Sequence, residues 1–512
     1  MQTTGEKKIS TTAVSEKNLI AGHSREYGDF LKKQSIFVDY SYAELEEMNL
    51  KVKKERLSGV TEAEFEKRFL QYLRDEKGVK AVMVCFSDME GKFHILDYDK
   101  KFLLNGVDNL TFDGSSIKGF TEQKESDLRL KIDWSTFKWV PADIFGAGKV
   151  LTFGYVCDKD GGPYQGDFRY NLANLCADLA KKGITVNVAP EIEGFLFKGE
   201  NAEQTYDERV GFELATQSGY FNTLPQGTLR LFIDKFAEAQ RALAFENEKD
   251  HPEVAPAQFE LNYKYTEALY AADQIQLYKL LARQVARIMG FTACFLPKPI
   301  SGMNGSGMHT NMSLSKNDKN IFFDAADVHK LSKDAYRFLT SILYYGNDLC
   351  LLMNPSVNAY RRLDPAFEAP NEIKVSAVDR GSMVRIPIGN ERSARIEVRT
   401  VAPDANPYIY LFALIKAGLN GFEVSDEEMK AMEKVVYTGK AKKLPGDIYS
   451  AITLFEKSKF MEEIIGKRNK EVFTALKKKS ADRAPRCLGA KVKAEEILYH
   501  HEVTNQMLWN DF

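Results

Sequence analysis

Pro190-Glu191-Ile192-Glu193-Gly194-Phe195-Leu196-Phe197 is the stretch from which the rest of the chain is interpreted. Its apolar and β-favouring residues predict a strand, in which residues two apart point the same way. Glu191 and Glu193 therefore share one face of a strand that is hydrophobic enough to be buried. Two carboxylates this close repel each other, so one takes up a proton unless a cation sits between them. Two interpretations stay open: an edge strand with both acids in water, or a metal site that needs further ligands.

The composition is that of a globular protein and argues against several functional classes. The chain has 512 residues, which is enough for two or three domains and a large core. A net charge of -2 gives no reason to expect a nucleic-acid or membrane partner. No apolar run is long enough to span a bilayer, and the first residues lack the apolar centre of a signal peptide. We therefore expect a soluble, cytoplasmic enzyme.

The first 160 residues predict an extension followed by a small α+β domain. Residues 1–60 are charged and weakly patterned, and we interpret them as an N-terminal extension that is partly disordered. A capping threonine at Thr61 and regular apolar spacing predict a helix over 61–75, and two strands joined by a turn follow at 79–96. The loop Asp113-Gly114-Ser115-Ser116 adds one acid and two hydroxyls, although Asp-Gly-Ser is commonly just a turn.

The remaining residues predict a larger domain that mixes strands and helices. A Gly-rich stretch precedes His309, but it is not a Walker loop, because no Gly-Lys-Ser/Thr follows at the right offset. From Pro407 onward the apolar spacing is mostly helical. Helices are expected at 171–182, 227–247, 277–289 and 494–509, and a strand at 291–296.

Acids within apolar strands recur along the chain, and a histidine joins them from the Gly-rich stretch. Hard divalent cations take oxygen ligands, and Mn²⁺ also accepts an imidazole. The six cysteines are scattered and lie outside these stretches, which favours reduced thiols and argues against structural zinc. For any single glutamate we favour pairing with a nearby arginine, but five such acids are costly to bury uncompensated. The candidate set, which suits two cations, is Glu191, Glu193, Glu253, Glu260, Glu397 and His309.

Residues 354–399 form the most basic segment. Guanidinium groups stay charged and bind phosphate oxygens through two parallel hydrogen bonds. Near metal-type acids they indicate a polyphosphate and a second anionic substrate, because Mg²⁺ or Mn²⁺ with arginines is the machinery of phosphoryl transfer. Acids in the same segment are numerous enough to pair many of these arginines, so a salt-bridged surface stays open. The arginines are Arg361, Arg362, Arg380, Arg385, Arg392, Arg395 and Arg399.

From about Glu62 to the C-terminus the motifs resemble those of glutamine synthetase of the bacterial type I kind, in family order. The resemblance implies an α+β fold, with a small β-grasp-like domain at 61–160 and a large catalytic α/β domain at 161–512. The latter would contain an antiparallel sheet and C-terminal helices. The motifs are Asp113-Gly114-Ser115-Ser116, Glu191-x-Glu193, His251-x-Glu253-Val254-Ala255-Pro256, Lys298-Pro299, Asn304-Gly305-Ser306-Gly307-Met308-His309, Asn354-Pro355, Glu368-Ala369-Pro370 and Arg395-Ile396-Glu397-Val398-Arg399.

The resemblance implies a reaction and its cofactors. Such enzymes use ATP to phosphorylate the side-chain carboxylate of L-glutamate, and ammonia then displaces the phosphate to give L-glutamine. A carboxylate is a poor electrophile, which is why the acyl phosphate is made first. Two or more Mg²⁺ or Mn²⁺ ions per active site would offset the charge on the reacting groups. One ion would be held by Glu193, Glu253 and Glu260, and the other by Glu191, His309 and Glu397.

The resemblance also implies which residues bind the substrates. Arg362 would bind the α-carboxylate of glutamate, and Tyr265 would pack on adenine. Glutamate would be bound by Asn304, Gly305, Arg362 and Arg399. The phosphates and the transferring group would face Arg380, Arg385, Arg392 and Arg395, with Glu248, Asn311 and Ser313 near the nucleotide.

Ammonia requires a cation-binding pocket and a base. By resemblance, Asp113 and Ser116 belong to this pocket, and Asp113 would take the proton from ammonium. Glu368 would lie on a flap that shields the acyl phosphate from water. In the family the Asp113 loop comes from the neighbouring subunit. The resemblance therefore implies a homo-oligomer of two stacked hexamers with active sites between subunits.

Two other functions stay open. The chain could join glutamate to a larger amine, such as a polyamine or methylamine. The loop at 113–116 argues against this, because those relatives tend to lose it. The chain could also be a catalytically inactive assembly protein on the same scaffold, which the complete set of metal ligands and arginines argues against.

Overall fold

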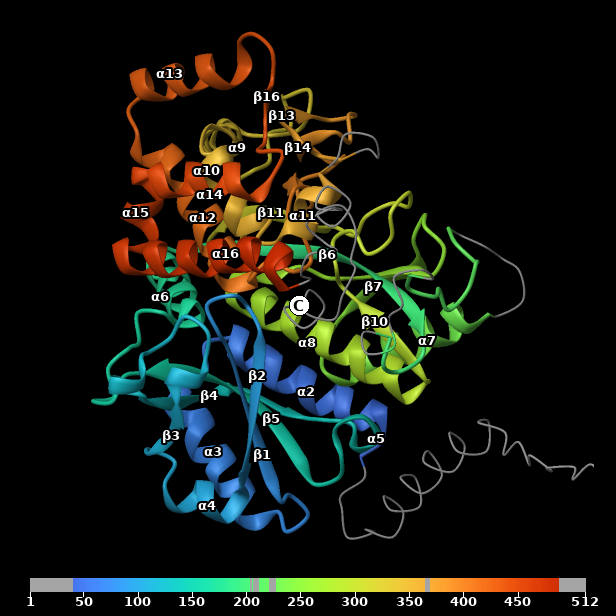
Figure 1. Cartoon of the computed structure of the whole chain (residues 1–512). Coiled ribbons are helices and arrows are strands. Elements are labelled where there is room, and N and C mark those ends of the chain that lie inside the picture. Colours follow the sequence, from blue (N-terminus) through green and yellow to red (C-terminus); the bar gives the residue numbers. More distant parts are fainter. Residues whose placement is uncertain (1–39, 203–204, 206–210, 221–226, 364–368, 488–512) are drawn as a thin grey trace, which may run out of the picture.

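A computed structural model of the chain describes residues 40–202, 205, 211–220, 227–363 and 369–487. Within these ranges a five-stranded and an eleven-stranded sheet form the framework, and helices pack on and beside them (Figure 1). A small sheet-and-helix unit thus precedes a large unit with C-terminal helices, which confirms the predicted α+β fold class. The expected helix at 494–509 and most of the N-terminal extension lie outside the described residues.

The small sheet has the strand order β2–β1–β5–β4–β3. Strand β1 (Ala81–Ser87) pairs antiparallel with β2 (Phe93–Asp99) and parallel with β5 (Lys149–Cys157). Strand β4 (Asp127–Trp139) lies antiparallel to β5 and to β3 (Leu110–Asp113). Short helical segments complete the unit: α4 (Lys100–Asn105), η1 (Gly114–Ser116), η2 (Gln123–Glu125) and α5 (Ala142–Phe145).

Helix α3 (Glu62–Asp75) covers one face of this sheet. It begins at a capping box in which Thr61 and Glu64 bond each other's backbone, as the sequence predicts. Strand β1 is buried on both faces, because alternate residues enter different cores. Val82 and Val84 pack with α3, whereas Met83 and Cys85 join the core of the large unit. The two units therefore share an apolar boundary.

The large sheet runs β16–β13–β14–β15–β11–β6–β8–β7, with β9, β10 and β12 attached at its side. Its strand pairs are antiparallel except for β13 with β14. The central strand is β6 (Ile184–Lys198), which contains the opening stretch. The other strands are β7 (Asn247–Pro252), β8 (Gln258–Tyr263), β9 (Thr266–Glu267), β10 (Phe291–Cys294), β11 (Met308–Lys316), β12 (Lys319–Asn320), β13 (Glu372–Ser376), β14 (Ser382–Arg385), β15 (Ile396–Val398) and β16 (Lys442–Lys443).

Helices surround this sheet, and two of them, α8 and α12, are almost entirely buried in the core. The helices are α6 (Phe168–Ala180), α7 (Thr228–Ala242), α8 (Ala268–Ile288), α9 (Lys333–Tyr344), α10 (Gly346–Met353), α11 (Val357–Arg362), α12 (Pro407–Glu423), α13 (Asp426–Tyr437), α14 (Ile448–Lys457), α15 (Lys459–Ile465) and α16 (Lys467–Cys487). In the described part of the chain, none is both long and apolar enough to cross a bilayer.

The prediction of a helix over 227–247 is wrong at the C-terminal end. Helix α7 stops at Ala242, because Ala244 adopts the left-handed conformation with φ 65°. Residues from Asn247 onward pair with β8 and form β7 instead. Apolar spacing alone did not reveal this change of direction, which brings β7 to the functional site.

Helix α2 (Tyr42–Leu57) precedes both units in the sequence. Its buried side chains include Leu45, Asn49, Val52 and Lys53, and the helix packs against β4 of the small sheet and against α7. Figure 1 places it between the small sheet and α8. The predicted boundaries at residues 60 and 160 stay a prediction, but this part of the extension contacts both units.

Glu90, in the turn between β1 and β2, connects the small unit to α16. Its carboxylate lies 2.7 Å from Nζ of Lys477 and 3.3 Å from Nζ of Lys118. Burial alone raises the pKa of a carboxyl, but the two ammonium groups more than offset it and lower the pKa of Glu90 to about 2. Since this folded-state pKa lies below the ordinary 4.5, the pairs stabilise the protein above pH 4.5 and lose effect as pH falls toward 2.

The Glu90→Gln variant should lower the free energy of unfolding by about 3 kcal/mol at neutral pH. Urea unfolding at about pH 7, 5 and 4 measures the free energy of unfolding of both proteins. The difference between the two free energies should be smallest at pH 4, because Glu90 of the unchanged protein then takes up a proton when the protein unfolds. Glu433→Gln, at an exposed position on α13, is the matched control and should change little. A difference that stays constant down to pH 4 would contradict the assignment.

Candidate active site

A cavity of about 870 Å³ opens over the centre of the large sheet, beside β6. Its lining combines acidic side chains with arginines from the segment 380–399. Most of the predicted site residues come together here: Glu191, Glu193, Glu248, Glu253, Glu260, Tyr265, Asn304, Gly305, His309, Asn311, Ser313, Arg362, Arg380, Arg385, Arg392, Arg395 and Arg399.

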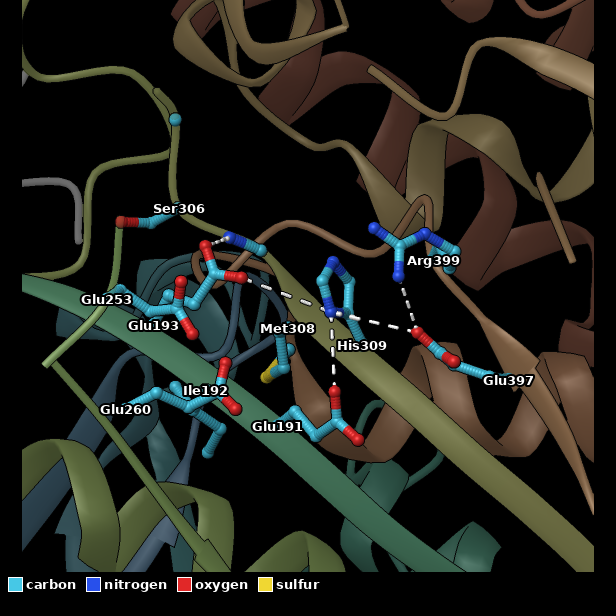
Figure 2. Close-up of polar contacts among 12 residues, drawn as sticks. Glu191, Ile192, Glu193, Glu253, Glu260, Ser306, Met308, His309, Glu397 and Arg399 are labelled. Carbon is cyan, nitrogen blue, oxygen red and sulfur yellow. Dashed lines mark hydrogen bonds and ion pairs between the residues drawn. The ribbon is translucent and has the colours of Figure 1, made fainter. Parts of the chain in front are cut away.

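The first acidic cluster forms where three strands lie side by side. The register of β6 and β11 sets His309 opposite Glu191, and β15 brings Glu397 alongside. Nδ1 of His309 lies 3.5 Å from a carboxylate oxygen of Glu191 and 3.9 Å from one of Glu397, as Figure 2 shows. Two carboxylates and an imidazole from separate strands thus converge on one point.

Charges around this cluster favour the ionised form of Glu191. Burial alone would raise the pKa of Glu191, but His309, Asn311 and Arg385 more than offset it and lower the pKa to about 2. Glu397 is fully buried and pairs with Arg385 and, at 2.7 Å, with Arg399. The sequence alternative of a glutamate paired with arginines is therefore realised at Glu397, within the cluster itself.

The second acidic cluster contains His251, Glu253 and Glu260. Nδ1 of His251 lies 3.7 Å from Glu253, and Nε2 lies 3.7 Å from Glu260. Burial and the neighbouring carboxylates, Glu193 foremost, raise the pKa of Glu253 and hold that of Glu260 well above its usual range. These groups resist ionisation together, so a cation among them would relieve both burial and repulsion.

Glu193 lies between the two clusters (Figure 2). One of its oxygens accepts from the backbone N–H of Gly307 at 2.9 Å, and the other lies 3.9 Å from Nδ1 of His309. The opening stretch therefore brings Glu191 to the first cluster and Glu193 between the two clusters, whereas its alternation predicts only that both acids share one face. Sequence reasoning did not include His251 in the metal set. The signal was its position opposite Glu260 in the β7–β8 register, which only the structure provides.

The donor atoms fit hard divalent cations. In each cluster, ligand atoms of two carboxylates and one imidazole lie within 4.8 Å of one another. Oxygen donors with a single nitrogen suit Mg²⁺ or Mn²⁺. The residues that would hold such ions are Glu191, His309 and Glu397 on one side, and Glu193, Glu253, Glu260 and His251 on the other.

The Gly-rich stretch brings backbone close to functional side chains. A Cβ at Gly305 would lie 2.6 Å from the carbonyl oxygen of Pro297, and one at Gly307 would lie 2.7 Å from both Arg362 and His309. Larger residues would therefore displace these side chains. The stretch positions Arg362, His309 and Glu193 within the site.

Arg362 is held firmly in place by the surrounding backbone. It is 8% exposed and donates to the carbonyl oxygens of Arg399, Thr400 and Val401 at 2.8 to 3.3 Å. Burial lowers its pKa to about 10, which still leaves the guanidinium charged at neutral pH. A fixed cation beside Gly305 can bind a carboxylate at little cost in side-chain order.

The side of the cavity next to β7 and the end of β8 is more open. Tyr265 is 49% exposed and follows β8, and Glu248 is exposed on β7. Arg395 donates to Oδ1 of Asn311 at 2.9 Å, and the amide of Asn311 donates to Glu191 at the same distance. These two hydrogen bonds connect Glu191 of the first acidic cluster to Arg395 through Asn311.

Two predicted catalytic residues lie elsewhere. Asp113 and Ser116 are exposed on the small unit and are not among the described residues that line the cavity. The carboxylate of Asp113 accepts from Oγ of Ser115 at 2.6 Å and from Oγ of Ser116 at 2.5 Å, which lowers its pKa. Glu368 lies outside the described residues. A single subunit therefore leaves this loop apart from the cavity.

Comparison with known families adds a separate finding. The family model described as glutamine synthetase, catalytic domain, matches residues 165–489. The family model described as glutamine synthetase, beta-Grasp domain, matches residues 78–158. Glutamine synthetase of Methanosarcina mazei is 35% identical over 408 residues, covering 76% of this chain and 88% of the relative. That of Clostridium saccharobutylicum is 35% identical over 420 residues, covering 79% and 92%.

Solved structures share the fold. A Plasmodium falciparum glutamine synthetase determined by cryo-electron microscopy has a TM-score of 0.75 at 22% identity, covering 85% of this chain and 98% of the other. A structure described as a GmaS/ADP complex has a TM-score of 0.70 at 23% identity, covering 84% and 99%. At these identities the likeness concerns the fold alone.

Proposed function

The chain belongs to the glutamine synthetase family, and we propose that it ligates ammonia to the γ-carboxylate of L-glutamate through γ-glutamyl phosphate. Its activity class is that of an ATP-dependent glutamate–ammonia ligase. The single observation that supports the mechanism best is a cavity at which two carboxylate–imidazole clusters and the arginines of the segment 380–399 meet. We further propose that the chain is of the bacterial type I kind.

Glutamate would lie with its α-carboxylate on Arg362, whose fixed and buried guanidinium is ready to bind it. Asn304, Gly305 and Arg399 would hold the rest of the molecule. The γ-carboxylate would then point toward the acidic clusters, where negative charge needs compensation. Bound Mg²⁺ or Mn²⁺ would supply that compensation for the γ-phosphate and the glutamate carboxylate during transfer.

The first chemical step forms a bond between a γ-carboxylate oxygen of glutamate and the γ-phosphorus of ATP, and ADP leaves. Four arginines would orient the phosphates and offset the charge on the transferring oxygens. They are Arg380, Arg385, Arg392 and Arg395. Tyr265 would pack on adenine, and Glu248, Asn311 and Ser313 would lie near the nucleotide.

In the second step ammonia attacks the carbonyl carbon and phosphate leaves. Asp113 would hold the ammonium ion through its carboxylate and take a proton from it. Because Asp113 and Ser116 lie outside the cavity of their own chain, a neighbouring subunit would supply them. We therefore propose a homo-oligomer with active sites between subunits, built as two stacked hexamers, with Glu368 covering the site against water.

A phosphate-release assay with ATP and glutamate tests this function. Ammonium should support release with one glutamine formed per phosphate, and methylamine or a polyamine should support much less at equal concentration. A larger amine that outpaces ammonium would favour the alternative ligase. No release with any amine would favour an inactive assembly protein.

A further inference from the structure

Helix α2 lies outside the segments that the family models match, which begin at residue 78. It is nevertheless built into the fold rather than appended to it. Asn49 is 1% exposed and Lys53 is 3% exposed, although both are polar. Polar side chains are rarely buried without a specific partner, so their contacts indicate what the helix does.

The partners of these side chains include the last carbonyl group of α7 and the carbonyl groups of the residues that follow it, and Asn49 also bonds the backbone of Trp139 on β4. The amide of Asn49 donates to the carbonyl oxygen of Ala242 at 2.7 Å. Lys53 donates to that of Ala244 at 3.3 Å, and Lys138 of β4 donates to that of Leu243 at 3.2 Å. The C-terminus of a helix leaves carbonyls without helical partners and carries partial negative charge, so ammonium groups stabilise it.

The same lysine reaches the segment that follows α7. Nζ of Lys53 lies 2.8 Å from a carboxylate oxygen of Glu246, and the other oxygen of Glu246 lies 3.2 Å from Nζ of Lys264. The backbone N–H of Lys264 donates to the carbonyl oxygen of Glu246 at 2.9 Å. Glu246 thus joins the starting end of β7 to the finishing end of β8.

These two ends lead directly to the nucleotide side of the cavity. Glu248 is two residues after Glu246, and Tyr265 is one residue after Lys264. Lys264 itself lines the cavity beside them. Any shift of Glu246 would therefore move both residues that are expected to contact the nucleotide, while the glutamate side, held by Arg362 and the Gly-rich stretch, lies on other segments.

From these contacts we propose that α2 is a positioning element for the nucleotide, in which Lys53 acts through Glu246 on Glu248 and Tyr265. Lys53 is a positioning residue, since it does not line the cavity. This inference rests on the proposed function only in that it takes the β7–β8 side of the cavity to be the nucleotide side.

The Lys53→Met variant of the full-length enzyme tests this role. It keeps the apolar stem of the side chain and removes the charge. The dissociation constant for ADP and the KM for ATP should rise about tenfold, while kcat and the KM for glutamate change less than about twofold. Lys54→Met, at the exposed neighbouring position on α2, is the matched control and should leave all four values unchanged.

Glu246→Gln provides a second route to the same answer, because its side chain is 40% exposed and the substitution is mild for folding. It should weaken nucleotide binding by a similar factor, and the double variant should be little worse than either single variant. A loss of kcat with both KM values unchanged would mean a merely structural role and would overturn the proposal, as would an equal rise in both KM values. ADP binding is measured without turnover, so the result is independent of which amine the enzyme uses.

Discussion

Replacing Glu397 with glutamine should reduce turnover by roughly a thousandfold or more. The carboxylate is fully buried and lies where Arg385, Arg399 and His309 meet. Glutamine has nearly the same shape, so it preserves packing while removing the negative charge that a cation and both arginines would use. The effect should appear in kcat, because charge at this point matters most while the phosphoryl group is in transit.

Steady-state kinetics, which give kcat, and Mn²⁺ titration of the same preparation, which counts the bound ions, test this prediction. The variant should bind one Mn²⁺ fewer per subunit, and its particle size should match that of the unchanged enzyme. Glu372→Gln is the control, because Glu372 lies on the same sheet and pairs with Lys374 but belongs to neither acidic cluster. Unchanged turnover or metal binding in Glu397→Gln would remove Glu397 from the site.

Mixing two inactive variants should restore activity. Asp113→Asn lacks the proposed base, and Glu397→Gln lacks the buried acid, so each homogeneous oligomer should be nearly inactive. If the Asp113 loop comes from a neighbour, random mixed oligomers contain sites with both native residues. An equal mixture should regain about a quarter of the unchanged turnover, since each site needs the right subunit on both sides.

Co-expression with two different affinity tags and purification on both provides such mixed oligomers. An Asp113→Asn protein that carries both tags is the control and should stay inactive. A mixture no more active than its parents would mean that Asp113 acts within its own subunit or not at all. The exposed position of Asp113 outside the cavity of its own chain favours recovery.

The sequence was sufficient to predict which side chains share a face of one strand. Glu191 and Glu193 share a face because side chains alternate in a strand. Six of the seven arginines of the segment 354–399 line the cavity, and Arg361 does not. What alternation could not reveal was pairing between distant strands, which is why His251 became visible as a partner of Glu260 only in the β7–β8 register.

Helix ends and long-range polar contacts were also beyond the sequence. Apolar spacing continued past Ala242, but the left-handed Ala244 ends the helix and turns the chain into β7. Residues 42–57 showed no clear apolar stripe, because Asn49 and Lys53 occupy buried positions that a hydrophobicity pattern scores as polar. Their burial depends on carbonyl groups roughly two hundred residues later in the chain, and no local rule predicts such partners.

The central claim is that glutamate is activated as an acyl phosphate before ammonia attacks, and oxygen transfer tests it most directly. The enzyme would be given ATP, ammonium and glutamate labelled with ¹⁸O in the γ-carboxylate, and the phosphate product would be analysed by mass spectrometry. The mechanism predicts one ¹⁸O atom in each phosphate, because the bridging oxygen of γ-glutamyl phosphate leaves with phosphorus, and one retained in the glutamine amide. Unlabelled phosphate formed together with glutamine would contradict it.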